Sequence, residues 1–509
     1  MQNKRNLESK TLDLLELSHL IKKTHFDKKI GLCHGVFDVL HSGHMRHFQE
    51  ASRLVDILIV SVTTDSEVNK GPGRPINKIK DRIEALAAIE YIDFVVESKS
   101  PSSVEIITNL SPAIYFKGND YSNLSTEGLK DPAGNLEEES KVVKMQGGII
   151  HFTSSELRSS SSIINSYSNI SINHSRVLDH VKKFFEKRPL EKVLSEIKNM
   201  KIGLIGEVIK DEYIFTESLG KSGKHPLVAQ RELYRKEFMG GIYPVMETIN
   251  SFVNKNNLYV TSIYGSQEII NSIPYSNKII FDPSYTNISK IRYINEKTNT
   301  FLFETYKMDD KYIEEKNEKL LLQNLQEFSN SVDLLIALDF GHGLITPKLR
   351  NLMCTNFNNF ALNVQKNAGN KGNSSIGKYA KAKVIVLNGE EVELELRQKG
   401  IKIEEAALLI LKNMNANIVV ITDGNNGLVI TDGNDVVTVP TFHVGNIIDR
   451  TGAGDAVFTI ISIFSLVISD LTVLGYLGNL AGSINLSWLA NEKSITVEDI
   501  IKSVYYGLK

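Results

Sequence analysis

The chain has 509 residues, 42% of them hydrophobic and 23% charged, so it is too long for one ordinary core and we expect two or three domains. With 58 basic and 60 acidic residues its formal net charge is −2, which gives no general attraction to nucleic acid or to an anionic membrane. Two cysteines are too few for a disulfide framework and indicate a reducing compartment.

The N-terminal stretch, MQNKRNLESKTLDLLELSHL, lacks the apolar core of a signal peptide. The longest apolar run, about 13 residues from Ala456, is too short to span a bilayer and indicates a buried helix. We therefore expect a cytoplasmic protein with no membrane or nucleic-acid partner.

The first region of alternating strand and helix patterns begins near Lys29. Its strand candidates, among them KIGLCHGVF, DILIVSVTTD and AIYFKG, are separated by helical patterns. Such alternation favours a parallel sheet covered by helices, so we expect an α/β domain over residues 1–165.

A second α/β region begins at KIGLIGEVI, near Lys201, and runs to the end of the chain. Its strand candidates include NLYVTSIYG, DLLIALDFG, AKVIVLNGEE and NIVVITDG. We expect this domain over 201–509 and a charged helical linker over 166–200. The two regions share no repeat, which indicates a fusion and not a duplication.

The first region carries two histidines in HGVFDVLHSGHMRHF, directly after a strand candidate. His41 and His44 would lie at a helix N-terminus, where imidazoles and the helix end can bind phosphate oxygens. Fixed donors of this kind stabilise the charge that develops when an α-phosphate is attacked. A metal pair or two solvated helix residues would give the same spacing, so the two histidines by themselves leave the role open.

With its flanking residues this stretch resembles the signature of the HxGH nucleotidyltransferase superfamily, in its cytidylyltransferase-like branch. The resemblance implies a Rossmann-like fold in which His41 and His44 are catalytic. It also implies that Gly35, Phe37 and Asp38 belong to the nucleotide site.

Two later segments of the same domain look like those of ADP-heptose synthases. KGPGRPINKIKDR matches a segment with a Lys-Gly, an Arg-Pro and a later Arg, and FKGNDY matches a Lys-Gly-Gly-Asp-Tyr segment with Asn119 in place of one glycine. The residues that this resemblance implies are Lys70, Arg74 and Asp120 for substrate binding, Arg82 for nucleotide binding and Lys117 for catalysis.

A serine-rich stretch, FTSSELRSSSSIINS, follows the last strand candidate of this domain. The family closes its site with a Ser/Thr-rich turn, where hydroxyls and free N–H groups at a helix start can hold phosphates. A flexible linker is the alternative explanation. The position after a strand favours a nucleotide site formed by Ser160, Ser161 and Ser162, with the register among the four serines open.

In the second region, IIDRTGAGDAVF places a tight glycine turn just ahead of Asp455. Such a turn before a helix exposes backbone N–H groups and forms an anion hole, here from Gly452, Ala453 and Gly454. A carboxylate at its edge can accept the proton of an attacking hydroxyl while the hole stabilises the transferring phosphoryl group. An ordinary strand-to-helix turn with an acid in its first turn would share the pattern.

The stretch resembles the Asp-Thr-Thr-Gly-Ala-Gly-Asp signature of the ribokinase-like (PfkB) carbohydrate kinases. The resemblance implies a ribokinase-like α/β sandwich that phosphorylates a sugar with ATP. It places Asn388 at the nucleotide and Glu391 at Mg²⁺, through water, in the family's Asn-x-x-Glu pattern. The turn ITDGNNG supplies Thr422, Gly424 and Gly427 beside the nucleotide.

At the acceptor end the resemblance is less complete. Asp211 stands where the heptose kinases bind sugar hydroxyls, and Gly240 and Gly241 remain from the family's sugar motif. Four departures predict either a different sugar or polyol or weakened catalysis. They are Glu207 for an aspartate, Pro244 for an asparagine, His342 for a lysine and Asn363–Gln365 for Asp-Pro-Lys.

Together the motifs predict a sugar kinase and a nucleotidyltransferase in one chain, in the reverse order to the bifunctional ADP-heptose synthases. We expect ATP or CTP and a sugar or sugar 1-phosphate as substrates, Mg²⁺ as cofactor and pyrophosphate and ADP as products. A CTP-dependent transferase for a small polyol phosphate is one alternative. A C-terminal half that only binds or dimerises is another, and a homodimer is possible because ribokinase-like domains often dimerise.

Overall fold

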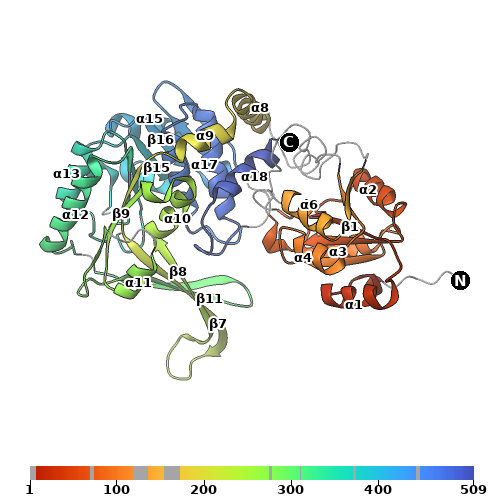
Figure 1. The fold of residues 1–509 in the computed structure, drawn as a ribbon. Coiled ribbons are helices and arrows are strands. Elements are labelled where there is room, and N and C mark those ends of the chain that lie inside the picture. The colour runs from red at the N-terminus through yellow and green to blue at the C-terminus, as the bar shows by residue number, and fades with distance from the viewer. Residues whose placement is uncertain are drawn as a thin grey trace. The chain divides into compact units, whose positions relative to one another are not determined.

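The computed structural model describes eight stretches of the chain, which form two compact units. Unit 1 comprises Met1–Ser171 with Ile501–Lys509, and unit 2 comprises Ile172–Ile500. Figure 1 colours them by residue number. No helix in the described stretches is long and apolar enough to cross a membrane. The stretches are residues 7–68, 74–118, 136–153, 172–273, 278–309, 311–370, 374–442 and 447–508.

Unit 1 is built on a five-stranded parallel sheet with the order β3-β2-β1-β4-β5. The chain reverses its direction of travel across the sheet between β1 and β4, and ligands of open α/β sheets bind at such a point, beyond the carboxyl ends of the strands. The histidine segment follows β1 and so leaves the sheet there. The strands are β1 (Ile30–Gly35), β2 (Ile57–Thr63), β3 (Phe94–Ser98), β4 (Ile114–Lys117) and β5 (Ile149–Phe152).

Helices cover both faces of this sheet. Successive side chains of a strand point to opposite faces, and in β2 Leu58 and Val60 join one apolar cluster while Ile57 and Ile59 join the other. The first cluster includes residues of α2 (Ser42–Ser52) and α3 (Ile79–Ala87). The second includes residues of α1 (Leu14–Thr24), α4 (Val104–Leu110) and α6 (Leu136–Met145).

Unit 2 contains a nine-stranded sheet with the order β10-β9-β6-β13-β14-β15-β16-β17-β18. The strands are parallel from β10 to β16, and β17 and β18 add an antiparallel edge. They are β6 (Ile202–Gly206), β9 (Leu258–Tyr264), β10 (Ile279–Phe281), β13 (Leu334–Asp339), β14 (Phe360–Val364), β15 (Val384–Asn388), β16 (Ile418–Thr422), β17 (Leu428–Thr431) and β18 (Val436–Val439).

The helices of unit 2 pack on this sheet and on one another. Leu325, Met353 and Ile410, from three of these helices, share one apolar cluster with the strands. Helices α8 and α9, which occupy most of the 166–200 segment, fall within unit 2. The helices are α8 (Ile172–Lys187), α9 (Leu190–Ile197), α10 (Ile242–Phe252), α11 (Gln267–Ser272), α12 (Glu315–Ser329), α13 (Pro347–Asn356), α14 (Gly389–Leu396), α15 (Ile403–Asn413), α16 (Ala453–Phe464) and α17 (Leu471–Asn485).

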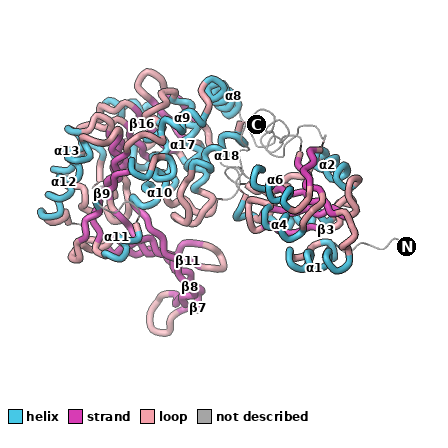
Figure 2. The backbone as a smooth tube through the Cα atoms, in the orientation of Figure 1, coloured by secondary structure: helices cyan, strands magenta, loops and turns pink. Residues whose placement is uncertain are grey.

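A second sheet of unit 2, which we call the lid sheet, has the order β12-β11-β7-β8. Its strands β7 and β8 form a long antiparallel hairpin that projects from the body of the unit (Figure 2). β11 pairs with β7 in parallel, which sets Lys290 opposite Asp211. The strands are β7 (Val208–Lys221), β8 (Val228–Gly241), β11 (Ile288–Asn295) and β12 (Thr300–Lys307).

Candidate active sites

The glycine turn of unit 2 ends in an open helix N-terminus. Gly452 caps α16 with a φ of +82°, which L side chains rarely adopt, and a Cβ there would come within 2.9 Å of the Asn491 side-chain oxygen. Among the described residues no side chain caps this helix. The backbone N–H groups of its first turn lie at the positive end of the helix, where an anion hole can form, and that of Ala453 also donates to the Arg450 carbonyl oxygen at 3.4 Å.

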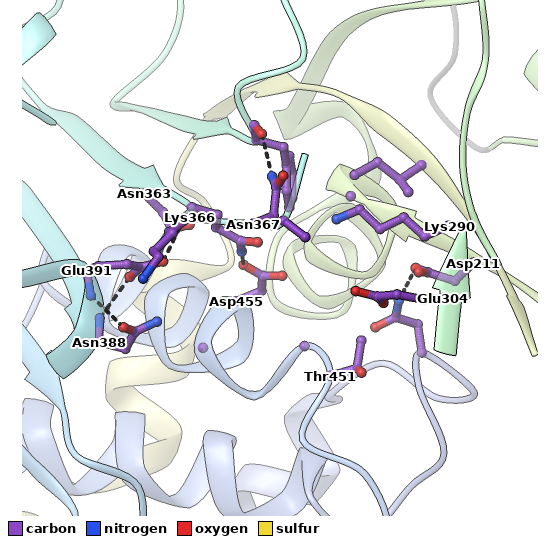
Figure 3. Close-up of a pocket in the computed structure, with 18 of the residues that line it drawn as sticks. Asp211, Lys290, Glu304, Asn363, Lys366, Asn367, Asn388, Glu391, Thr451 and Asp455 are labelled. Carbon is purple, nitrogen blue, oxygen red and sulfur yellow. Dashed lines mark hydrogen bonds between the residues drawn. The ribbon is translucent and has the colours of Figure 1, made fainter. Parts of the chain in front are cut away.

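Two cavities meet at this helix end. The first, about 420 Å³, is walled on one side by the lid sheet and on the other by the ends of the central strands (Figure 3). The second, about 700 Å³, lies over the turn after β16 and over α17. We call them the acceptor pocket and the nucleotide pocket, after the roles that the sequence predicts for their residues. Asn388, Thr422 and Gly454 line both, so the two pockets adjoin at these residues.

Asp455 lies in the first turn of α16 and lines the acceptor pocket. Burial raises the pKa of its carboxyl to about 7, and the nearby Lys290 ammonium opposes that rise. Its Oδ1 accepts a hydrogen bond from Gln365 Nε2. A carboxyl with a pKa near neutrality, beside an anion hole, is suited to accept the proton of an attacking hydroxyl.

The Asn-x-x-Glu pattern forms the N-terminus of α14. Asn388 Oδ1 accepts from the Glu391 N–H, and Glu391 Oε2 accepts from the Asn388 N–H, each at 2.9 Å. This reciprocal pair is a capping box. Glu391 Oε1 also accepts from the Lys366 N–H at 3.1 Å. The two residues thus hold the helix end that separates the two pockets, in addition to any role toward a ligand.

The lid sheet supplies a charged wall to the acceptor pocket. Asp211 is 4% exposed, and its Oδ1 accepts a 2.6 Å hydrogen bond from Arg292 Nη1. The Lys290 ammonium lies over the rings of Tyr306 and Phe340 and forms no ion pair with a described residue. Burial lowers the pKa of Lys290, although the Asp211 carboxylate opposes this.

Gly240 and Gly241, the two glycines of the sugar motif, leave space for the charged side chains of the lid sheet. A Cβ at Gly240 would lie 2.0 Å from Asp211 Oδ2, so only glycine allows the carboxylate to occupy its place. Gly241 has a φ of +63°, precedes α10 as its N-cap and lines the acceptor pocket. Pro244, in the first turn of α10, borders a small cavity that also reaches Gly452 and Asp455.

Two further departures, Glu207 and His342, lie behind the acceptor pocket. The buried Glu207 carboxylate accepts from the backbone N–H groups of Phe340, at 3.1 Å, and His342, at 3.3 Å. Burial and the neighbouring Asp339 carboxylate raise the pKa of Glu207 to about 8. Since Phe340 lines the pocket, Glu207 fixes the loop that shapes it.

In unit 1 the two candidate histidines cap α2 together. His41 Nδ1 accepts from the Gly43 N–H at 3.1 Å, and His44 Nδ1 accepts from the His41 N–H at 3.4 Å. Their rings stack with centroids 3.9 Å apart. Because an Nδ1 that accepts cannot carry the proton of a neutral imidazole, that proton lies on Nε2, which is then the donor for a ligand.

Asp38 and Arg82 organise the backbone around this loop. Asp38 accepts from the backbone N–H groups of Ile76 and Asn77 at 2.9 and 2.8 Å. Arg82 is 1% exposed and donates to the Val36 carbonyl oxygen at 2.6 Å. Gly35 ends β1, Phe37 follows in a left-handed conformation, and Arg74 Nη1 lies 3.9 Å from Asp38 Oδ2.

Lys117 ends β4 in a buried ion pair that the sequence did not reveal. Its Nζ lies 2.8 Å from Glu139 Oε2, on α6. Glu139 is 1% exposed and also accepts from Tyr115 Oη at 3.1 Å and from the Ser103 N–H at 3.0 Å. The ion pair with Glu139 fixes the position of the Lys117 side chain. Lys70, Asp120, Ser160, Ser161 and Ser162 lie outside the described residues.

Comparison with known families assigns both units. Residues 32–166 match the cytidylyltransferase-like family, and residues 287–461 match the pfkB family of carbohydrate kinases. The chain carries a cytidylyltransferase-like domain followed by a pfkB carbohydrate kinase domain. The predicted two-domain α/β fold, with a Rossmann-like sheet first and a ribokinase-like fold second, is confirmed, and so is the predicted domain order.

Curated relatives match over part of their length. The chain is 37% identical over 150 residues to the bifunctional protein HldE of Aliarcobacter butzleri (strain RM4018), which covers 29% of this chain and 30% of that protein. It is 39% identical over 123 residues to HldE of Campylobacter jejuni subsp. jejuni serotype O:6, which covers 24% and 26%. These matches span less than a third of either relative.

Solved structures align with the larger part of the chain. A ribokinase from Thermotoga maritima aligns with a TM-score of 0.45 and 15% identity over 60% of this chain and 99% of that one. Phosphofructokinase-2 from Escherichia coli in complex with potassium aligns with a TM-score of 0.47 and 13% identity, over 61% and 100%.

Two side-chain oxygen donors in the kinase domain, from Asn363 and Glu391, fit Mg²⁺. Asn363 is 4% exposed, its Nδ2 donates to the Val386 carbonyl oxygen at 3.1 Å, and its Oδ1 has no hydrogen-bond partner among the described residues. It lines the acceptor pocket together with the Glu391 carboxylate. A buried amide oxygen and a carboxylate suit a hard cation that keeps several waters.

Several contacts of the kinase site had no signal in the sequence. Gln365, known from the sequence only as a departure from a family motif, contacts Asp455, and Asn491 Nδ2 lies 3.5 Å from Asp211 Oδ2. Lys290 and Arg292 lie two positions apart on β11. Because successive side chains of a strand point to opposite faces, the sequence could have predicted that these two share one face. What they face is decided only by the packing of the lid sheet.

Proposed function

We propose that this protein is a bifunctional sugar-activating enzyme. Its kinase domain phosphorylates a sugar with ATP. Its transferase domain joins a nucleotidyl group from ATP or CTP to a sugar 1-phosphate of the heptose 1-phosphate type and releases pyrophosphate. The observation that supports this best is the position of Asp455, at an uncapped helix N-terminus where a polar acceptor pocket meets a larger nucleotide pocket.

In the kinase reaction Asp455 accepts the proton of an acceptor hydroxyl. The hydroxyl oxygen attacks the γ-phosphorus of ATP, and the bond from that phosphorus to the β-phosphate oxygen breaks to release ADP. The N–H groups of Gly452, Ala453 and Gly454 stabilise the charge on the transferring group. Asp211 and the lid sheet hold the acceptor. Glu391 would hold Mg²⁺ through water, and the bound ion would supply positive charge against the phosphates.

In this proposal the wall of the nucleotide pocket orients ATP. Thr422 ends β16, Gly424 and Gly427 belong to the turn that follows, and both glycines have positive φ. A side chain at Gly427 would meet the Val439 carbonyl oxygen at 2.1 Å. This turn therefore leaves the pocket open beside the end of β16, and a flat nucleotide base can lie between the turn and α17.

In the transferase reaction an oxygen of the sugar 1-phosphate attacks the α-phosphorus of the nucleoside triphosphate. The bond to the β-phosphate breaks, and pyrophosphate leaves. His41 and His44 donate from Nε2 to the oxygens on which charge accumulates, and the positive end of α2 adds to their effect. Lys117, which its ion pair with Glu139 fixes at the end of β4, is the third catalytic residue of the proposal.

Two assays test the proposal. ADP formation is measured with ATP and a panel of sugars and sugar phosphates, and pyrophosphate release with ATP or CTP and a panel of sugar 1-phosphates. Asp455→Asn should lower sugar-dependent ADP formation by about 10²- to 10⁴-fold without changing pyrophosphate release. His41→Ala should lower pyrophosphate release by about 10²- to 10³-fold without changing sugar-dependent ADP formation. If neither product forms with any acceptor, the proposal is wrong.

A second candidate is a CTP-dependent transferase for a small polyol phosphate, with a kinase domain that has changed acceptor or lost activity. The position of Pro244 beside the cavity at Asp455 favours it, because proline offers no side-chain hydrogen bond to a sugar. In that case pyrophosphate release depends on CTP, and if the kinase domain has lost activity, Asp455→Asn leaves every activity unchanged. The proposal also includes a homodimer and a cytoplasmic location. It divides the chain into residues 1–165, 166–200 and 201–509.

A further inference from the structure

Two consecutive residues at the exit of β14 contact the two acids of the kinase site. Gln365 Nε2 donates to Asp455 Oδ1, and the next backbone N–H, that of Lys366, donates to Glu391 Oε1 at 3.1 Å. Gln365 stands where the kinases that the chain resembles carry a lysine. The contact to Asp455 is therefore made here by a neutral amide.

Further hydrogen bonds hold the backbones of both Gln365 and Asp455. The Gln365 N–H donates to the Asp339 carbonyl oxygen at 3.0 Å, and its own carbonyl oxygen accepts from Asn370 Nδ2 at 2.8 Å. Asp455 lies in a helix whose next nine residues are all buried, and its carbonyl oxygen accepts from Thr459 Oγ1 at 2.6 Å. The amide and the carboxylate meet because two fixed backbones direct them together.

One hydrogen bond of this kind leaves the second carboxylate oxygen for chemistry. Asp455 Oδ2 accepts no hydrogen bond from the described residues, and Figure 3 shows the Asp455 side chain directed into the pocket. We propose that Gln365 is a positioning residue of the kinase reaction, which holds Asp455 by Oδ1 so that Oδ2 takes the proton of the acceptor hydroxyl. This inference rests on the proposed kinase function.

The groups around Asp455 make its protonation a sensitive test of this contact. Lys290 from β11 is positive, while Glu391 from α14 and Asp211 from β7 are negative, and the Lys366 side chain lines the same pocket. The Gln365 amide stabilises the ionised carboxylate, so its loss raises the pKa of Asp455 above about 7. A glutamate at the same position raises it further, because a like charge then faces the carboxylate.

The experiment compares Gln365→Leu and Gln365→Glu with Gln267→Glu, a charge-matched change at an exposed position of α11. The rate constant kcat and the KM values for ATP and acceptor are measured against pH. Both Gln365 variants should lose about 10- to 100-fold in kcat near pH 7. They should also move the acidic limb of the profile to higher pH, Glu more than Leu, with KM for ATP unchanged. Gln267→Glu should match the wild type.

A loss of kcat without movement of the acidic limb would overturn the inference, since it would show a structural effect alone. A separate measurement needs no turnover: infrared difference spectra between the wild type and Asp455→Asn follow the titration of this one carboxyl. Its midpoint should rise in both Gln365 variants, and an unchanged midpoint overturns the inference. An enzyme that forms no ADP with any acceptor contradicts the proposed function, while the infrared titration still decides the contact.

Discussion

Tyr213 on the lid strand β7 donates a 3.0 Å hydrogen bond from its hydroxyl to Asp449 Oδ2, three residues before the glycine turn. Asp449 also accepts from the Ala490 N–H at 3.0 Å and from the Thr451 N–H at 3.0 Å. The ring of Tyr213 lies 5.3 Å from the Arg292 guanidinium, which in turn pairs with Asp211. One side chain therefore ties the acceptor wall to the backbone that forms the anion hole.

Removal of this hydroxyl should loosen the tie without changing the fold. We expect Tyr213→Phe to lower the free energy of unfolding by about 0.5–1.5 kcal/mol, because Asp449 keeps its backbone donors. Urea unfolding measures this, and sugar-dependent ADP formation should fall about 3- to 10-fold in kcat, since the anion hole is less rigid. Tyr312→Phe, at a side chain 55% exposed, is the control and should change neither value. Equal rates for Tyr213→Phe and wild type would show that the tie has no part in turnover.

A methyl group at Gly240 should disable the acceptor wall selectively. The added Cβ would lie 2.0 Å from Asp211 Oδ2, so the carboxylate must move away from Arg292. We expect Gly240→Ala to raise the KM for the acceptor at least about 10-fold while the KM for ATP stays the same, because the nucleotide pocket is untouched. Gly223→Ala, where a Cβ would meet nothing within 4 Å, is the matched control. An unchanged acceptor KM would place the sugar elsewhere.

The acidic limb of kinase activity should report Asp455. Burial raises its pKa from 3.8 to about 7, so the carboxyl is mostly protonated below pH 7 and cannot accept a proton from the acceptor. We expect kcat/KM to rise with pH to a plateau above about 7. A limb near pH 4 would mean that the base is a carboxyl of ordinary pKa.

The same shift makes a prediction about stability. The folded state binds a proton at Asp455 more tightly than the unfolded state does, so its contribution to stability falls as the pH rises from about 4 through about 7. Asp455→Asn has no charge to bury and should therefore unfold at a higher temperature than the wild type at pH 8, with a smaller difference at pH 5. Thermal unfolding at the two pH values measures this, and a variant less stable at both contradicts it.

In the transferase domain, Glu139→Gln should leave the Lys117 ammonium buried without its counter-charge. Breaking a buried pair by removing one partner costs about 3–5 kcal/mol, and the glutamine keeps the shape of the side chain. We expect lower stability of this domain and slower pyrophosphate release, with ADP formation unchanged. Glu137→Gln, on the same helix but in an exposed pair with Lys141, should change stability by less than about 1 kcal/mol. Similar losses in both variants would point to a general effect on α6.

The parts of the site that lie on one short stretch of chain were predictable. His41 and His44 cap a helix three residues apart, and Gly452 to Asp455 form a turn and a helix start. In each case local backbone geometry decides where the groups point, and glycine positions and cap spacing record that geometry in the sequence. The alternation of buried strands and helices likewise predicted both α/β sheets, because burial on both faces requires continuous apolar runs.

The lid sheet and the contacts across the sites were not predictable in this way. Strands β8 and β12 are mostly exposed, so they lack the burial that marks the strands of a covered sheet. Gln365 and Asp455 are 90 positions apart, and Asp211 and Arg292 are 81 apart.

The sequence by itself therefore determined the two α/β domains, their order and the local geometry of the histidine cap and the glycine turn, since these follow from local propensity and periodicity. Only the tertiary structure decided what surrounds the reacting groups. Gln365 on Asp455, Arg292 on Asp211 and Glu139 on Lys117 are pairs made by packing distant elements together. The protonation of Asp455, which controls the proposed chemistry, depends on burial and on neighbours brought from other strands.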